Sequence, residues 1–187
     1  MIKAIITDFD GTLVDTFEAN LRAYQKAFAE VGLMLSPERY RECFGYRYER
    51  FMSAMAIYDE GIAHKIKEAK KEHYPQFFGF LKPNNALIDF IASFKAMGGK
   101  TAIASTARKE NLMNAVEYLG IGGIFDLIYA GADVKQGKPS PEIYLKSMEV
   151  LKVSPNETLI FEDSQVGIEA AKASGAHCMI VSQRQFD

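Results

Sequence analysis

The pattern of hydrophobic positions changes soon after the start of the chain. A short apolar run over residues 2–6 is rich in β-branched residues and is followed by turn-forming residues, so it predicts a buried strand. From Asp15 onward the hydrophobic positions recur every three or four residues, which is typical of one face of an α-helix. Asp15 and Glu18 have the spacing of a capping box at the start of this helix, and Gly32 suits its end.

Three further helices are expected before the pattern changes again. The tripeptide Ser-Pro-Glu at residues 36–38 is typical of a helix start. The hydrophobic spacing predicts two more helices, over about 48–58 and 62–74. Two prolines and a glycine within residues 75–83 then indicate a linker, so the segment after the first strand is all-helical.

Beyond this linker, short apolar runs alternate with helical patterns. The expected strands cover residues 101–104, 127–130, 158–161 and 178–181. Strands that alternate with helices favour a parallel sheet with right-handed crossovers. The fold class is therefore α/β, a parallel sheet flanked by helices, with a small α-helical insertion after the first strand.

This pattern divides the chain into two domains. Residues 1–15 and 80–187 are expected to form a discontinuous α/β core domain, and residues 16–79 a small helical domain. The chain crosses between the two domains twice, and two such crossings make a natural hinge.

Composition narrows the class of protein without changing this picture. The 187 residues include 48% hydrophobic and 25% charged residues and carry a formal net charge of −2, so neither nucleic acid nor an anionic membrane is expected as a partner. No apolar stretch has the length of a membrane span, and the N-terminus lacks a signal pattern. The two cysteines are far apart in the sequence, so we expect a cytoplasmic protein without disulfides. The three histidines lack metal-ligand spacing, so none of them is expected to bind a metal.

Polar side chains follow four of the expected strands. They are Asp8 and Asp10 after the first strand, Ser105 and Thr106 after the second, Lys138 after the third, and Glu162 and Asp163 after the fourth. Because the carboxyl ends of parallel strands meet at one edge of a sheet, we expect these side chains to converge there. Several carboxylates in one place repel each other unless a cation lies between them, and Mg²⁺ is the hard cation that such oxygen ligands suit.

These motifs identify a family resemblance that covers essentially the whole chain. The sequence resembles the haloacid dehalogenase superfamily, and within it the enzymes with a helical cap, the branch of β-phosphoglucomutase and phosphoglycolate phosphatase. The four motifs are Asp8-Phe9-Asp10-Gly11-Thr12, Ser105-Thr106, Lys138 within Gly-Lys-Pro-Ser-Pro-Glu, and Glu162-Asp163 with Ser164 and Gly167. The resemblance implies a Rossmann-like sheet of five parallel strands with the first strand central, and it makes the helical insertion a cap.

The resemblance also implies a role for each of these residues. Asp8 would be the nucleophile that forms an aspartyl-phosphate, and Asp10 would act as general acid and base. Lys138 would bridge the phosphate and the nucleophile, and Ser105 or Thr106 would hydrogen-bond the transferring phosphoryl group. Mg²⁺ would be held by Asp8, Asp163 and the backbone carbonyl of Asp10, with Glu162 either a direct ligand or a partner of the ligands.

Further contacts with the phosphate or substrate are expected by the same resemblance. The residues are Gly11, Thr12 and Thr106, together with Arg47 of the helical insertion and Arg108 after the second motif. The expected partner is a small phosphorylated metabolite, with no nucleic acid and no membrane, and we expect a monomer or a weak homodimer.

Three functions stay open at this level: a Mg²⁺-dependent phosphatase, a sugar phosphomutase of the β-phosphoglucomutase type, and a non-catalytic phosphate-binding or regulatory protein. The third function is disfavoured because every catalytic position of the family is present. Dehalogenation is also disfavoured, because the dehalogenase branch lacks the second aspartate of the first motif, which is Asp10 here. Asn20 stands where the mutase branch typically has a histidine in its first cap helix. We therefore expect a phosphatase that acts on a sugar phosphate or a phosphoglycolate-like compound.

Overall fold

The computed structural model describes residues 1–182 and residue 186. The chain divides into two compact units, Met1–Asp15 with Lys82–Asp187, and Thr16–Leu81. We call them the α/β unit and the helical unit and describe each by itself. Within the described residues, no helix is both long enough and apolar enough to cross a membrane.

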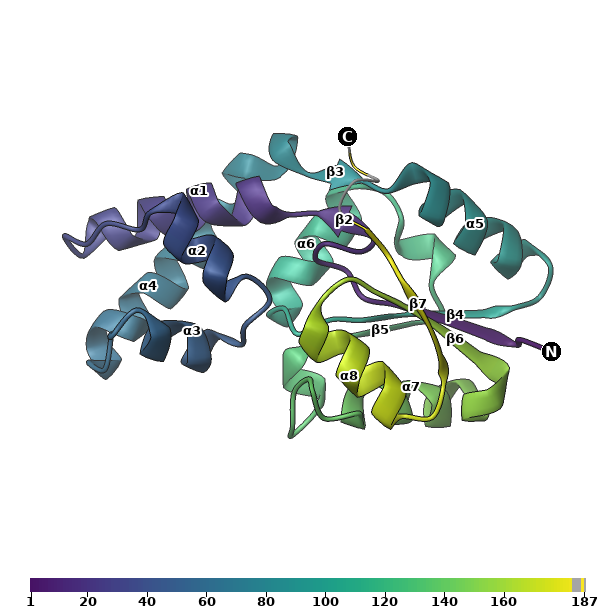
Figure 1. Cartoon of the computed structure of the whole chain (residues 1–187). Coiled ribbons are helices and arrows are strands. Elements are labelled where there is room, and N and C mark those ends of the chain that lie inside the picture. Colours follow the sequence, from purple (N-terminus) through teal and green to yellow (C-terminus); the bar gives the residue numbers. More distant parts are fainter. Residues whose placement is uncertain (183–185, 187) are drawn as a thin grey trace. The chain divides into compact units, whose positions relative to one another are not determined.

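The α/β unit is built on a five-stranded parallel sheet (Figure 1). The strand order is β5-β4-β1-β6-β7, so the first strand of the chain is central. This confirms the expected fold class and the place of the first strand. The strands are β1 (Ala4–Thr7), β4 (Lys100–Ala104), β5 (Leu127–Tyr129), β6 (Thr158–Glu162) and β7 (His177–Ile180).

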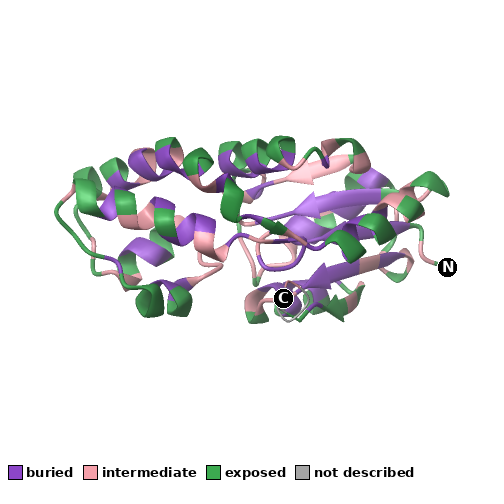
Figure 2. Cartoon of the chain, turned by 90° about the horizontal axis from the view of Figure 1, so that it is seen from above, coloured by how far each residue is buried: buried purple, intermediate pink, exposed green. Residues whose placement is uncertain are grey.

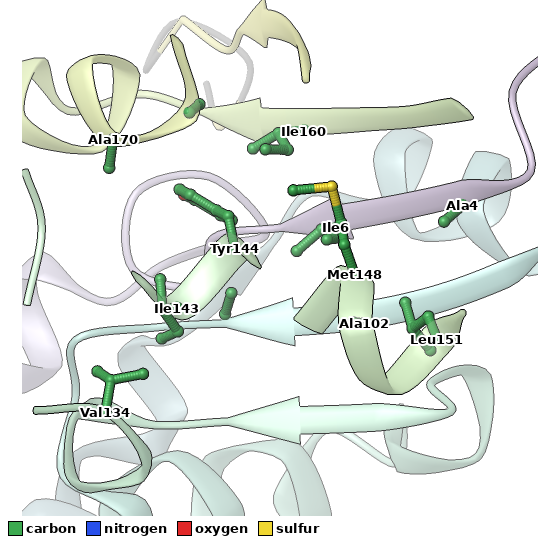
Figure 3. Close-up of a cluster of buried hydrophobic side chains, with 12 residues drawn as sticks. Ala4, Ile6, Ala102, Val134, Ile143, Tyr144, Met148, Leu151, Ile160 and Ala170 are labelled. Atoms are coloured by element: carbon green, nitrogen blue, oxygen red, sulfur yellow. The ribbon is translucent and has the colours of Figure 1, made fainter. Parts of the chain in front are cut away.

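Successive side chains of each strand point to opposite faces of the sheet, and those on one face belong to a buried hydrophobic core. Ile6 of β1 stands opposite Ala102 of β4 and Ile160 of β6, and all three are fully buried. Side chains of α7 (Glu142–Leu151) and α8 (Gln165–Ala173) pack against this face, and Figure 3 shows Tyr144 and Met148 of α7 in the cluster. The other elements of this unit are α5 (Asn85–Ala96), α6 (Lys109–Tyr118), η2 (Gly122–Ile124), η3 (Gly131–Asp133) and η4 (Pro155–Glu157).

The helical unit has a separate, aromatic-rich core. Its helices are α1 (Phe17–Glu30), α2 (Pro37–Cys43), α3 (Tyr48–Ala54), α4 (Glu60–His73) and the 3₁₀ helix η1 (Tyr74–Phe80). The rings of Tyr24, Tyr40 and Phe51 lie 4.9–5.7 Å apart in pairs, a separation at which tilted and edge-on rings attract each other. Figure 2 shows the resulting pattern, in which each helix turns a buried side inward and an exposed side to solvent.

The helix starts agree with the sequence in one case and differ in another. Ser36 caps α2 as expected, since its hydroxyl accepts a hydrogen bond from the backbone N–H of Arg39. The expected capping box of Asp15 and Glu18 does not form. Helix α1 begins one residue later, with Thr16 at the cap position and no side-chain cap bond, because Asp15 belongs to a strand.

That strand is part of a short ribbon that the hydrophobic pattern did not reveal. β2 (Val14–Asp15) pairs antiparallel with β3 (Lys82–Pro83), so the segment that leaves the α/β unit runs beside the segment that returns to it. A tight turn precedes β2, in which the backbone N–H groups of Leu13 and Val14 donate to the carbonyl of Phe9. The pairing therefore brings the two ends of the inserted segment side by side.

Candidate active site

Asp8 and Lys138 form the centre of the site at the carboxyl end of β1. Asp8 is 6% exposed, and its backbone N–H donates to the carbonyl of Phe161 at 3.0 Å, which continues the pairing of β1 with β6. The ammonium of Lys138 donates to Asp8 Oδ1 and to Glu162 Oε1, at 2.5 Å in each case. The lysine therefore links two acidic residues at the carboxyl ends of different strands, β1 and β6.

The charge states of this pair follow from burial and from the surrounding carboxylates. Burial alone would lower the pKa of Lys138, but Asp8 and Glu162 outweigh it and raise that pKa well above its usual range. Burial raises the pKa of Asp8 well above its ordinary value; Lys138 opposes this effect, and Glu162 and Asp163 add to it. One ammonium thus does not balance the negative charge gathered here.

Glu162 is the most firmly held side chain of the site. It is fully buried, and Oε1 accepts hydrogen bonds from Lys138 Nζ at 2.5 Å and from the hydroxyl of Tyr144 at 2.7 Å. Oε2 accepts from the backbone N–H of Asp163, and from the N–H and hydroxyl of Ser164, at 3.1–3.2 Å. Burial would raise the pKa of Glu162, but Lys138 and these donors hold it below its ordinary value.

Asp163 lies beside the turn after β1. Its Oδ1 accepts a hydrogen bond from the hydroxyl of Thr12 at 2.8 Å. The pKa of Asp163 is raised to about 6. Burial is the main cause, the charge of Glu162 adds to it, and the hydrogen bond from Thr12 opposes it. The negative charge on this carboxylate is therefore only partly compensated.

The carboxylates fit a divalent cation. One oxygen from each of Asp8, Glu162 and Asp163 lies within 4.8 Å of the others, and oxygen is the ligand atom that Mg²⁺ prefers. Burial, and then the neighbouring carboxylates, raise the pKa values of Asp8 and Asp163, and a bound cation would favour the ionised form of both. The donor set therefore suits a hard metal ion.

Ser105, which follows β4, forms a hydrogen bond with Asp10, which follows β1. It is fully buried; its hydroxyl donates to Asp10 Oδ2 at 3.3 Å and accepts from the backbone N–H of Ala107 at 3.0 Å. Thr106 follows it, and Gly131 leaves room for the Thr106 carbonyl, since a Cβ there would lie 2.6 Å from that oxygen. The expected convergence at one edge of the sheet is thus seen for the motifs of β1, β4 and β6 and for Lys138.

The two arginines with expected substrate contacts both stand at the start of a helix. Arg108 is at the cap position of α6, and its Nε lies 3.5 Å from Glu110 Oε2. Arg47 is at the cap position of α3 in the helical unit. Their expected substrate contacts remain predictions.

Tyr144 is the residue of the site that the sequence did not indicate. Its position fits the hydrophobic stripe of α7, so periodicity assigned it to the core, and it is indeed fully buried. Its hydroxyl nevertheless reaches Glu162. A buried tyrosine hydroxyl usually has a hydrogen-bond partner, and that rule was the available signal.

Comparison with known proteins shows what the whole chain is similar to. Residues 5–181 match the model of the haloacid dehalogenase-like hydrolase family. The chain is 31% identical to a phosphorylated carbohydrates phosphatase of Thermotoga maritima over 180 residues, which cover 93% of this chain and 82% of the relative.

Two solved structures extend the likeness to three dimensions. The crystal structure of a mutant CbbY from Rhodobacter sphaeroides in complex with xylulose-1,5-bisphosphate matches 96% of this chain and 86% of its own, with a TM-score of 0.85 and 31% identity. The β-phosphoglucomutase of Clostridium difficile matches 100% of this chain and 87% of its own, with a TM-score of 0.83 and 25% identity.

Proposed function

Because the chain belongs to the haloacid dehalogenase-like hydrolases, we propose that it hydrolyses a phosphate monoester of a small phosphorylated carbohydrate. The observation that carries this proposal is the placement of Lys138 between Asp8 and Glu162, with Asp10 beside Ser105 on the same edge of the sheet. A nucleophile, a fixed positive charge and a second carboxylate are the groups that such a reaction needs.

Asp8 attacks the phosphorus atom in the first step. A carboxylate that approaches a phosphate dianion is repelled, and the ammonium of Lys138 offsets that repulsion while it fixes the orientation of Oδ1. The bond between phosphorus and the sugar oxygen breaks, and the phosphoryl group passes to Asp8 as an aspartyl-phosphate. Burial of Asp8 keeps bulk water away from the carboxylate and strengthens its electrostatic contacts.

Asp10 moves the protons. It gives a proton to the departing sugar oxygen in the first step and takes one from the attacking water in the second, which releases inorganic phosphate and restores Asp8. The hydrogen bond from Ser105 to Asp10 Oδ2 holds this carboxylate at the end of β4.

Asp8, Asp163 and the backbone carbonyl of Asp10 would hold Mg²⁺. The metal supplies charge neutralisation of the phosphoryl oxygens when bound. Glu162 already accepts five hydrogen bonds on its two oxygens, so we assign it the task of holding Lys138 and the loop after β6.

The helical unit favours hydrolysis over phosphoryl transfer between positions of a sugar. Asn20 is 8% exposed, and its amide donates to the carbonyl of Thr16 at 3.1 Å and to the hydroxyl of Tyr74 at 3.4 Å. An amide held in this way cannot accept and return a proton as a histidine can. The likeness to a β-phosphoglucomutase keeps the mutase as the second candidate.

A panel of phosphorylated sugars, sugar bisphosphates and phosphoglycolate tests the proposal. We expect Mg²⁺-dependent release of inorganic phosphate from at least one compound, loss of this activity with a chelator, and a fall of roughly a thousandfold in the variant Asp8→Asn. The exposed Asp89→Asn, on α5, is the matched control and should retain wild-type activity.

Two outcomes would count against it. Folded wild-type protein that releases phosphate from no compound would contradict the phosphatase. Conversion of a sugar phosphate to its isomer, dependent on a bisphosphate activator and without net phosphate release, would support the mutase instead.

A further inference from the structure

Tyr144 has a polar contact that packing alone does not require. The side chain rises from α7 into the hydrophobic cluster under the sheet, among Ile143, Met148 and Ile160 (Figure 3). Its hydroxyl donates to Glu162 Oε1 at 2.7 Å, and Lys138 Nζ lies 5.1 Å from the centre of its ring. The residue therefore touches both members of the Lys138–Glu162 pair from the side of the core.

Glu162 Oε1 is shared between two donors. Lys138 and Tyr144 both donate to this oxygen, while three donors on Oε2 keep the carboxylate from rotating. Lys138 is in turn shared between Glu162 and Asp8. Without the tyrosine hydroxyl, Lys138 would be the remaining donor to Oε1 among these contacts. The ammonium would then be drawn toward Glu162 and away from Asp8.

The hydroxyl can fill this role because it is a neutral hydrogen-bond donor. A neutral hydroxyl donates to a carboxylate without adding a charge. It can thus share the charge of Glu162 without competing with Lys138 for Asp8.

We propose that Tyr144 is a positioning residue, whose hydroxyl shares Glu162 Oε1 and so keeps the ammonium of Lys138 on Asp8. The inference rests on the proposed function, in which Lys138 acts at the phosphoryl group. It adds to that function a residue outside the four motifs, which acts from the hydrophobic core through Glu162.

The variant Tyr144→Phe isolates the hydroxyl, since it keeps the ring and its packing. We expect kcat to fall roughly 10-fold, the effect of one buried hydrogen bond to a charged group, with KM changed less than about 2-fold. Tyr129→Phe is the control, because Tyr129 packs against the same hydrophobic cluster, and it should keep the wild-type kcat. An unchanged kcat in Tyr144→Phe, with an active wild type, would overturn the inference.

A double-mutant cycle tests whether Tyr144 acts through Glu162. In the background Glu162→Gln, which weakens the pull on Lys138, we expect Tyr144→Phe to lower kcat by less than about 2-fold. Full additivity of the two substitutions would show that the tyrosine acts by another route and would overturn the proposal.

A measurement without turnover separates this inference from the proposed function. In protein labelled with ¹⁵N-lysine, the side-chain ammonium resonance of Lys138 should shift in Tyr144→Phe and stay in place in Tyr129→Phe. If the wild type released no phosphate but the resonance shifted, the proposed function would fail and the positioning role would stand. An unmoved resonance would overturn the positioning role even if the enzyme were active.

Discussion

Gly11 and Gly167 each bring the backbone close to an acidic side chain of the site. A Cβ at Gly11 would lie 2.3 Å from Asp163 Oδ2, and one at Gly167 would lie 1.9 Å from Glu162 Oε1. Gly11 also has a φ of +89°, a backbone conformation that other residues rarely adopt. Both glycines thus let a carboxylate lie directly against the main chain.

The variant Gly11→Ala should lose both stability and activity. The left-handed backbone costs an alanine about 1–2 kcal/mol, and the new methyl group would displace the Asp163 carboxylate. We expect a clear decrease in the free energy of unfolding and a fall of at least roughly 10-fold in phosphatase kcat. Urea denaturation and steady-state kinetics measure the two effects.

Gly120→Ala is the matched control for this change. Gly120 has a φ of +68°, but a Cβ there would meet nothing within 4 Å. It should show a similar loss of stability with wild-type kcat. Equal losses of activity in the two variants would mean that backbone strain, rather than the displacement of Asp163, explains the effect at Gly11.

Among the elements, η4 shows how a short turn is tied to the start of the sheet. Glu157 Oε2 accepts hydrogen bonds from the backbone N–H and the hydroxyl of Ser154, and Glu157 Oε1 lies 2.5 Å from Lys3 Nζ. The hydrogen bonds from Lys3 and Ser154 hold the pKa of Glu157 at about 2. The ionised carboxylate is therefore the form that the fold prefers.

This preference predicts a specific pH dependence for Glu157→Gln. The folded pKa lies below the ordinary value of 4.5, so the carboxylate stabilises the fold above that pH and stops doing so as the pH falls toward 2. The variant should thus be less stable than the wild type at pH 6, and the difference should shrink between about pH 4.5 and pH 2. Denaturation midpoints across this range measure it; a constant difference would contradict the assignment.

The elements also show what sequence patterns can and cannot establish. The buried strands were found to within a residue at most of their ends, because a run of β-branched residues between turn formers has few other uses. The start of α1 was misjudged, since Asp15 pairs with Lys82, a residue far along the chain. Strands of two residues carry no periodicity, so neither β2 nor β3 could be read from the pattern.

For the molecule as a whole, the important quantity is the charge balance at the carboxyl edge of the sheet. Oxygens of Asp8, Glu162 and Asp163 lie within 4.8 Å of one another, and among these contacts the positive charge comes from the ammonium of Lys138. A bound cation would relieve this repulsion in the native state only. Metal binding should therefore appear as stability of the entire α/β unit.

Addition of Mg²⁺ should raise the melting temperature. At a concentration 100 times the dissociation constant, binding to the native state contributes about 2.7 kcal/mol, a shift on the order of 5–10 °C for a protein of this size. Asp163→Asn should remove most of the shift, and Asp89→Asn should keep it. An equal shift in both variants, recorded by differential scanning calorimetry, would place the metal elsewhere.

The sequence predicted which polar side chains lie together better than it predicted the contacts between them. Motifs at strand ends indicated that Asp8, Asp10, Ser105, Lys138, Glu162 and Asp163 would meet at one edge, because the parallel topology fixes where strand ends meet. The contact of Tyr144 with Glu162 depends on how α7 packs under the sheet. No spacing along the chain encodes that packing.

The β2–β3 ribbon affects how the inserted segment can evolve. Because Asp15 stands opposite Lys82, the two ends of Thr16–Leu81 lie side by side on the α/β unit. An insertion whose ends are adjacent adds little to the entropy that the parent fold must lose, and it can be lengthened, shortened or replaced without moving a strand of the sheet. Selection can therefore exchange the module between the two strands of the ribbon without altering the carboxylates and the lysine at the carboxyl edge of the sheet.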